Sequence, residues 1–225
     1  MGTSVQTAAA RAAEETPLLV AIGRWIGANR QKALAIAGVL VIVMVMLAWN
    51  TLSARQTEQA AGVRLNAARL AFESRNYPLA ASELSQVVEN YSGTRAAQEA
   101  NILLAQSRLL QGQSQQAIEL LKRFASRADP AFRAQAYGLL GAAYDNVGHA
   151  KEAAEAYQQA ADAAQLPFLK AQFLTEAGRA WVAAGDTARA VQAYRAVVAQ
   201  TDSAAMVVVA GEAKVRLGEL TKGIR

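Results

Sequence analysis

The sequence predicts an all-α protein in which one N-terminal transmembrane helix precedes a solenoid of about four helix pairs and a C-terminal capping helix. Three observations indicate this architecture. Small and large residues recur every 36 or 37 positions over roughly residues 57–200, and a fixed period of this size is typical of stacked helix pairs. Ala, Leu, Gln, Glu and Arg, all good helix formers, are abundant. Residues 33–49 form an uninterrupted apolar run.

The repeat is clearest in residues 137–160 and 174–197, which align at a spacing of 37. In each unit a small residue of the first helix should face a small residue of the second, so that the two helices approach closely. A large residue four positions later lies on the same helix face and should fill the groove between units. The three aligned sets are Ala68, Ala105, Gly141 and Gly178; Ala80, Ala117, Ala153 and Ala190; and Leu84, Leu121, Tyr157 and Tyr194.

The same frame sets the helix boundaries. Each first helix should end at a residue that can adopt a left-handed backbone, and the candidates are Arg75 with Asn76, Gly112, Gly148 and Gly185. We expect helix pairs at 57–74 with 77–90, 95–111 with 114–127, 131–147 with 150–164, and 168–184 with 187–200. The chain then divides into a tail, 1–30, a membrane helix, 31–54, the solenoid, 55–202, and a capping segment, 203–225, whose helix should cover about 203–221.

The apolar run 33–49 is long enough to cross a bilayer. No charged residue occurs from 33 to 54, a stretch of 22 residues that spans about 33 Å as a helix. Arg30 and Lys32 precede the run, whereas uncharged residues follow it. The positive-inside rule therefore predicts a cytoplasmic N-terminus and repeats on the other side of the membrane, which in a bacterium is the periplasm. Trp49 can anchor the far interface.

The residues around this span carry further expectations. Residues 1–17 are small and polar, and we expect them to be disordered. Residues 18–27 form either an amphipathic stretch at the membrane surface, with Trp25 at headgroup level, or a plain linker. A cleaved signal peptide fits poorly, because some 32 residues precede the apolar run. Gly38 offers a point where another membrane helix can approach closely.

The two clearest units resemble the tetratricopeptide repeat. The matching residues are Leu140, Gly141, Tyr144, Ala153, Tyr157 and Ala160 in one unit, and Ala177, Gly178, Trp181, Ala190 and Tyr194 in the next. The two earlier units, about 61–94 and 98–130, keep only the small residues and the leucine. This resemblance covers roughly residues 57–200 and implies the fold, while it leaves the ligand open.

The composition gives little support to catalysis. There is no cysteine, which excludes disulfides and thiolate chemistry. His149 is the only histidine and lies in a turn beside Gly148, where a solvated or helix-capping role is expected. No nucleotide-binding glycine motif or metal-ligand spacing is present. The formal charge of +5 is spread thinly, unlike a nucleic-acid footprint. We therefore predict a non-enzyme with no catalytic residues, cofactor, metal or small-molecule substrate.

Protein partners should instead bind the concave surface of the solenoid, which the first helices of the pairs line. An ordinary solvated face is the alternative for any single residue. The candidate partner-binding residues are Arg69, Phe72, Glu73, Gln106, Leu109, Leu110, Asp145, Asn146, Gln172, Thr175 and Arg179.

The layout as a whole resembles the single-span ancillary subunits of the bacterial Sec translocon (the YfgM type). That resemblance implies a single-pass protein of the bacterial inner membrane whose periplasmic domain works with a translocon or with envelope chaperones. The alternative is a structural accessory subunit fixed in a large respiratory or photosynthetic membrane complex. In either case other proteins are the expected partners, and the two readings differ in whether the groove or the membrane helix makes the main contact.

Overall fold

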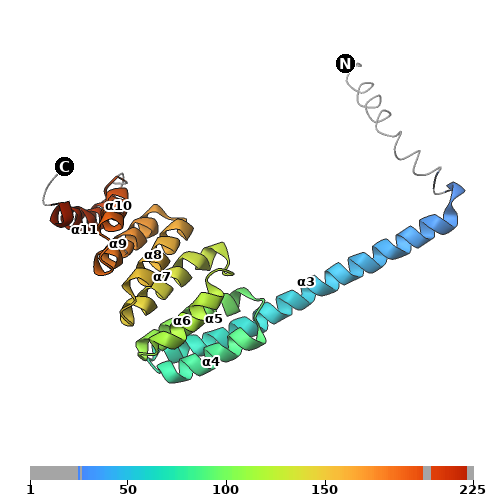
Figure 1. Ribbon diagram of the computed structural model, residues 1–225. Helices are drawn as coiled ribbons and strands as arrows, with labels where there is room; N and C mark the ends of the chain where they lie inside the picture. The colour runs from blue at the N-terminus through green and yellow to red at the C-terminus, as the bar shows by residue number, and fades with distance from the viewer. Residues whose placement is uncertain (1–24, 26, 200–203, 222–225) are drawn as a thin grey trace, which may run out of the picture. The chain divides into compact units, whose positions relative to one another are not determined.

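The computed structural model describes Trp25, residues 27–199 and residues 204–221 (Figure 1). Every regular element in these ranges is an α-helix, as predicted. Two compact units are present, Met1–Gln56 and Thr57–Arg225. The helices are α3 (Arg30–Glu73), α4 (Tyr77–Asn90), α5 (Arg95–Leu110), α6 (Ser114–Phe124), α7 (Pro130–Asn146), α8 (Ala150–Ala163), α9 (Pro167–Ala183), α10 (Thr187–Val198) and α11 (Ala204–Thr221).

Helix α3 runs without interruption from Arg30 to Glu73, whereas the sequence analysis expects separate helices at 31–54 and 57–74. The physical reason is local, since residues 50–57 contain neither proline nor glycine that would end a helix. Among the described helices, α3 is the one that is long and apolar enough to cross a membrane, and no residue of its apolar window is buried.

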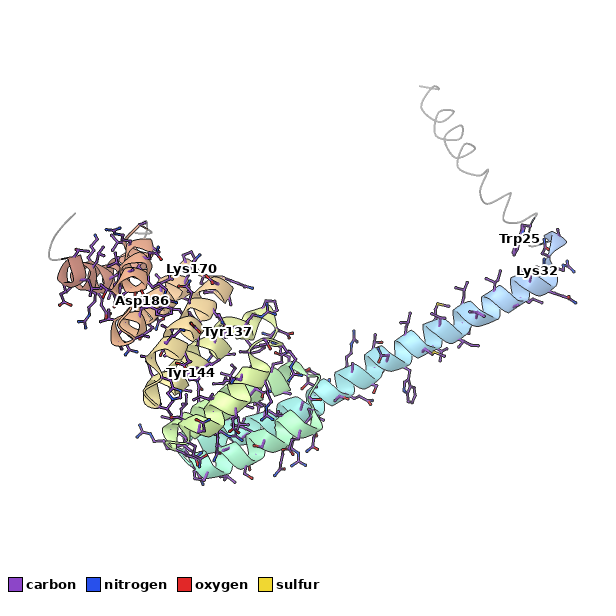
Figure 2. The ribbon with its side chains drawn as sticks, in the orientation of Figure 1. Trp25, Lys32, Tyr137, Tyr144, Lys170 and Asp186 are labelled. Atoms are coloured by element: carbon purple, nitrogen blue, oxygen red, sulfur yellow. The ribbon has the colours of Figure 1, made fainter. Side chains whose placement is uncertain are left out.

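The predicted anchor residues are all solvent-exposed within the first unit. Trp25 and Lys32 are labelled in Figure 2. Trp49 is 77% exposed, and a Cβ added at Gly38 would meet no atom within 4 Å. The predictions for residues 1–24 lie outside the described residues.

In the second unit the helices pair in the predicted order. The part of α3 beyond residue 57 pairs with α4, followed by α5 with α6, α7 with α8, and α9 with α10 (Figure 1). The observed starts lie within one residue of the predicted starts in α4 to α10. The largest difference is at the end of α6, which stops at Phe124 instead of residue 127, because the chain must leave the helix before α7 begins at Pro130.

Each first helix ends in a left-handed residue at the predicted position. The backbone φ is 61° at Arg75, 72° at Gly112, 76° at Gly148 and 79° at Gly185. In every case the next N–H donates to the carbonyl five residues earlier, which is the hydrogen-bond pattern of a Schellman cap. These bonds are Asn76 to Ala71, Gln113 to Arg108, His149 to Tyr144 and Asp186 to Trp181, with N···O distances of 2.8–3.0 Å.

Two glycines of the first helices make room for an aromatic ring from the second helix of the same pair. A Cβ added at Gly141 would lie 2.7 Å from carbons of the Tyr157 ring, and one at Gly178 would lie 2.7 Å from carbons of the Tyr194 ring. From the repeat pattern these large residues are expected to lie between neighbouring units. The structure instead seats each ring on the glycine of its own pair, because only glycine leaves space for it at this helix separation.

The core of the second unit consists of three clusters of buried residues, most of them small or aliphatic. Leu84 and Leu121 are fully buried in the first two pairs, and Tyr194 is 1% exposed in the last. Ala210 and Ala213 of α11 are buried in the same cluster as Tyr194. The terminal helix therefore covers the last pair, as expected of a cap.

Side chains cap the N-termini of two second helices. Asn76 Oδ1 accepts a hydrogen bond from the Leu79 N–H, 3.3 Å, and Asp186 Oδ1 accepts one from the Arg189 N–H, 3.0 Å. Asp186 also pairs with the Arg189 guanidinium, 2.5 Å. The bonds from the Arg189 backbone and side chain lower the pKa of the Asp186 carboxyl below its ordinary value.

These two caps should respond differently to pH. Because the folded pKa of Asp186 is depressed, its stabilising contribution is present above the unfolded pKa and is lost as the pH falls through the folded pKa. Asp186→Ala should therefore lower the melting temperature at neutral pH and lower it less in strong acid. Asn76→Ala should cost about 1 kcal/mol at both pH values. Circular dichroism melts at the two pH values test this, and an equal loss for Asp186→Ala at both would contradict it.

Candidate protein-binding groove

A groove of about 660 Å³ crosses the first helices of the second, third and fourth pairs. The lining residues on α7 and α9 recur with the three- and four-residue spacing of one helix face, so each helix presents one face to the groove. On α7 these include Gln135, Leu139, Ala142 and Asn146, and on α9 they include Gln172, Glu176 and Arg179. Gln106 of α5 and Tyr157 of α8 complete part of the wall.

A polar network connects α7, α8 and α9 in this groove. Arg179 Nη2 lies 2.6 Å from Asp145 Oδ2 and 2.9 Å from Glu176 Oε2. The Tyr157 hydroxyl donates to Asp145 Oδ2 at 3.2 Å. The Asp145 side chain is only 20% exposed, whereas that of Arg179 is 52% exposed. The network thus fixes the carboxylate and leaves the guanidinium accessible to a partner.

The tyrosine of this network is held as a hydrogen-bond donor. Burial raises the pKa of Tyr157 well above its ordinary value, and the negative charge of Asp145 raises it further. The hydroxyl therefore stays protonated across the physiological pH range. Because the same ring occupies the space over Gly141, the packing of the pair and the orientation of Asp145 depend on one residue.

Five of the residues predicted from the sequence lie together in the groove: Gln106, Asp145, Asn146, Gln172 and Arg179. Thr175 does not, and its assignment to the accessible surface is wrong. Its side chain is 7% exposed and its hydroxyl donates to the Ala171 carbonyl at 2.9 Å. On α9 the residue after it, Glu176, faces the groove instead.

The remaining predicted residues do not line this groove. Arg69 pairs with Glu99 of α5, and Phe72 packs edge-on against Tyr77 with ring centroids 5.6 Å apart. Leu109 is half-buried against the core of the middle pairs. Glu73 and Leu110 are exposed elsewhere.

Sequence reasoning missed Gln135, Leu139, Phe173 and Glu176 as lining residues. Helical spacing could have found three of them, since Gln135 and Leu139 precede Asn146 by eleven and seven positions and Glu176 follows Gln172 by four. Phe173 carries no such signal. It lines the groove because its ring crosses to α7 and lies over Gly138, where an added Cβ would clash with it.

The structure places His149 at the N-cap position of α8 without a side-chain capping bond. Its ring stacks on Tyr144 with centroids 6.2 Å apart. Across the described ranges, no group of three or more histidine, aspartate or glutamate side chains is close enough to hold a metal ion. The groove residues themselves offer hydrogen bonds, ion pairs and apolar contact.

Solved structures with the same arrangement of helices are repeat proteins. The TPR-like repeats of a putative kinesin light chain from Podosopora anserina are 21% identical, with a TM-score of 0.55 over 73% of this chain and 91% of that chain. The MamA protein is 20% identical, with a TM-score of 0.54 over 72% of this chain and 87% of that chain. At these identities the likeness shows the fold alone.

A comparison with curated protein sequences found no significant match. The family comparison is informative, because residues 53–168 match the tetratricopeptide repeat-like domain. This match covers more than half of the chain and agrees with the helix pairs, the left-handed turns and the glycine–tyrosine contacts described above. The chain therefore belongs to the tetratricopeptide repeat-like domain family.

Proposed function

We propose that this protein is a non-catalytic, membrane-anchored scaffold whose repeat domain holds a partner protein in the groove formed by α5, α7 and α9. The observation that carries the proposal is the Asp145–Arg179–Tyr157 network, which fixes a half-exposed guanidinium in a groove of about 660 Å³. Protein–protein binding is the general role of this repeat family.

The other groove residues suit an extended polypeptide segment. Gln106, Gln135 and Gln172 carry amides that can both donate to and accept from a peptide backbone. Leu139 and Phe173 supply apolar surface between them. A segment lying across the three first helices would therefore find backbone partners, apolar contact and a half-exposed guanidinium with N–H groups left to donate.

The apolar part of α3 supplies the anchor in this proposal. Its exposed apolar residues match the length of a bilayer core. Arg30 and Lys32 at its start favour a cytoplasmic N-terminus. The repeat domain would then lie in the periplasm of a bacterium. Tethering raises the effective concentration of a weakly bound partner at the membrane, so the groove need not bind tightly by itself.

A translocon or envelope chaperone is the partner class that the layout favours. The second candidate is a fixed accessory subunit of a respiratory or photosynthetic complex, in which the membrane helix makes the main contact. The small residue Gly38, open to approach from outside the helix, favours that alternative.

Site-specific photo-crosslinking in the full-length chain separates the two. A crosslinking amino acid at Gln135 or Gln172 should capture the partner, while the same group at Gln115, an exposed residue of α6 outside the groove, should not. Reversing the charges at Asp145 and Arg179 together should reduce capture about tenfold, as expected for a central charged contact. Capture that survives this reversal but is lost on changing Gly38 to leucine would contradict groove binding and support the fixed subunit.

A further inference from the structure

A second hollow, of about 570 Å³, lies between α4, α5 and α6 and shares no lining residue with the groove. Three arginines line it: Arg108 of α5, Arg123 in the last turn of α6, and Arg127 in the turn that follows α6. We call it the arginine hollow. The one carboxylate that lines it is Glu89 of α4, so its lining residues carry a net charge of +2.

These arginines are not neutralised by the protein. No ion pair within 4.0 Å joins any of them to a carboxylate in the described part of the chain, where other arginines do form such pairs. Each makes a hydrogen bond to a backbone carbonyl instead: Arg108 to Gln116, Arg123 to Glu119 and Arg127 to Arg123. These bonds occupy one nitrogen of each guanidinium and leave further N–H donors for a ligand.

Arg108 is particular to the second pair. The residues at the same position of the third and fourth pairs, 36 and 73 positions later, are Tyr144 and Trp181. Trp181 lines the corresponding hollow between α8, α9 and α10. At this position the second pair thus carries a cation where the later pairs carry an aromatic ring.

The inner surface of the arginine hollow is apolar. Leu104 is 2% exposed, and Leu120 and Phe124 pack half-buried against the core. Two amides stand beside them. Asn101 Nδ2 donates to the Ala97 carbonyl and Gln98 Oε1 accepts from the Asp129 N–H, which leaves the Asn101 oxygen and the Gln98 nitrogen to pair with a peptide backbone.

We propose that the arginine hollow binds an acidic segment of a protein partner, with an apolar side chain on Leu104, Leu120 and Phe124 and carboxylates on the three arginines. Charge complementarity selects the acidic class, and the volume lies in the range of sites that enclose a ligand. A planar anionic membrane is the poorer fit, because its phosphates present no apolar group to the inner surface. This surface is independent of the groove, so one domain can hold two segments.

The test uses full-length protein in non-ionic detergent and a fluorescent peptide in which glutamate alternates with leucine and phenylalanine. Fluorescence anisotropy should show saturable binding that weakens as salt is added. Replacing Arg123 and Arg127 together by glutamine should raise the dissociation constant about tenfold or more, since each loses charge-assisted hydrogen bonds. Lys122→Gln, an exposed neighbour on α6 outside the hollow, should change it by less than about twofold.

Four results would overturn the proposal. The first is the absence of peptide binding, and the second is equal binding of a peptide with glutamine in place of glutamate. The third is a loss of affinity in Lys122→Gln as large as that in the double arginine variant. The fourth is displacement of the peptide by phosphatidylglycerol vesicles that themselves bind through Arg123 and Arg127. The last would assign the hollow to anionic lipid. Both arginines to be replaced are exposed, and a matching melting temperature for parent and variant shows that lost binding is not lost folding.

Discussion

Replacing Gly141 by leucine is expected to lower the free energy of unfolding of the repeat domain by about 3 kcal/mol, the upper end of what overpacking costs. Even a methyl group at this position would lie 2.7 Å from the Tyr157 ring, and the nearest atoms include the base of the ring and not only its far end. The ring cannot swing away cheaply, because Tyr157 is 6% exposed. Urea unfolding of the full-length protein, followed by circular dichroism, measures the loss.

Three matched glycine-to-alanine variants control for helix propensity. Gly62 lies within α3, and a Cβ added there would meet nothing within 4 Å. Gly62→Ala should therefore stabilise the protein by about 0.5–1 kcal/mol, whereas Gly141→Ala and Gly178→Ala should destabilise it. Should Gly141→Ala prove as stable as Gly62→Ala, the glycine–tyrosine contact would not be the tight one described here.

Two arginines at the centre of the apolar part of α3 are expected to release the protein from membranes. A charged residue at the middle of a span costs about 2.5–3.5 kcal/mol by insertion measurements, so Val41→Arg with Val45→Arg should oppose insertion by roughly twice that. Alkaline extraction should leave the parent chain in the membrane pellet at full length and move the double variant to the supernatant.

The control places the same two charges at the same spacing beyond the centre of the apolar run. Asn50→Arg with Ala54→Arg lies near the end of the uncharged stretch, where long side chains can reach the interface. This variant should stay in the pellet. A parent chain that appeared in the supernatant in shortened form would show instead that the apolar run is cleaved, and the proposed anchor would be wrong.

The positions of the helix pairs could be predicted from the sequence because the turns that end the first helices depend on single residues. A residue with positive φ after each first helix is a property of the backbone at one position, and glycine supplies it at 112, 148 and 185. Arg75 was found only because the period requires a turn there. The continuity of α3 was not foreseen, because apolarity changes near residue 54 while helix propensity does not.

The groove was harder to predict for a geometric reason. Asp145 and Arg179 are 34 positions apart and meet only because α7 and α9 stack, which no local pattern encodes. On α9 the choice between Thr175 and Glu176 is a rotation of about 100° around the helix axis. The repeat period fixes the direction of a helix face only to about one residue. The sequence therefore indicated the buried Thr175 instead of its neighbour Glu176, which lines the groove.

The aromatic–glycine contacts of the repeat domain are of two kinds, within a pair and between pairs. Tyr157 over Gly141 joins the helices of one pair, whereas Phe173 over Gly138 joins one pair to the next. In a linear array these correspond to the intrinsic stability of a repeat and to its coupling with a neighbour. Phe173 contributes to the coupling between the third and fourth pairs, beside the Asp145–Arg179 ion pair and the packing of α8 on α9. Loosening this ring should therefore favour unfolding of the fourth pair and α11 before the rest of the array.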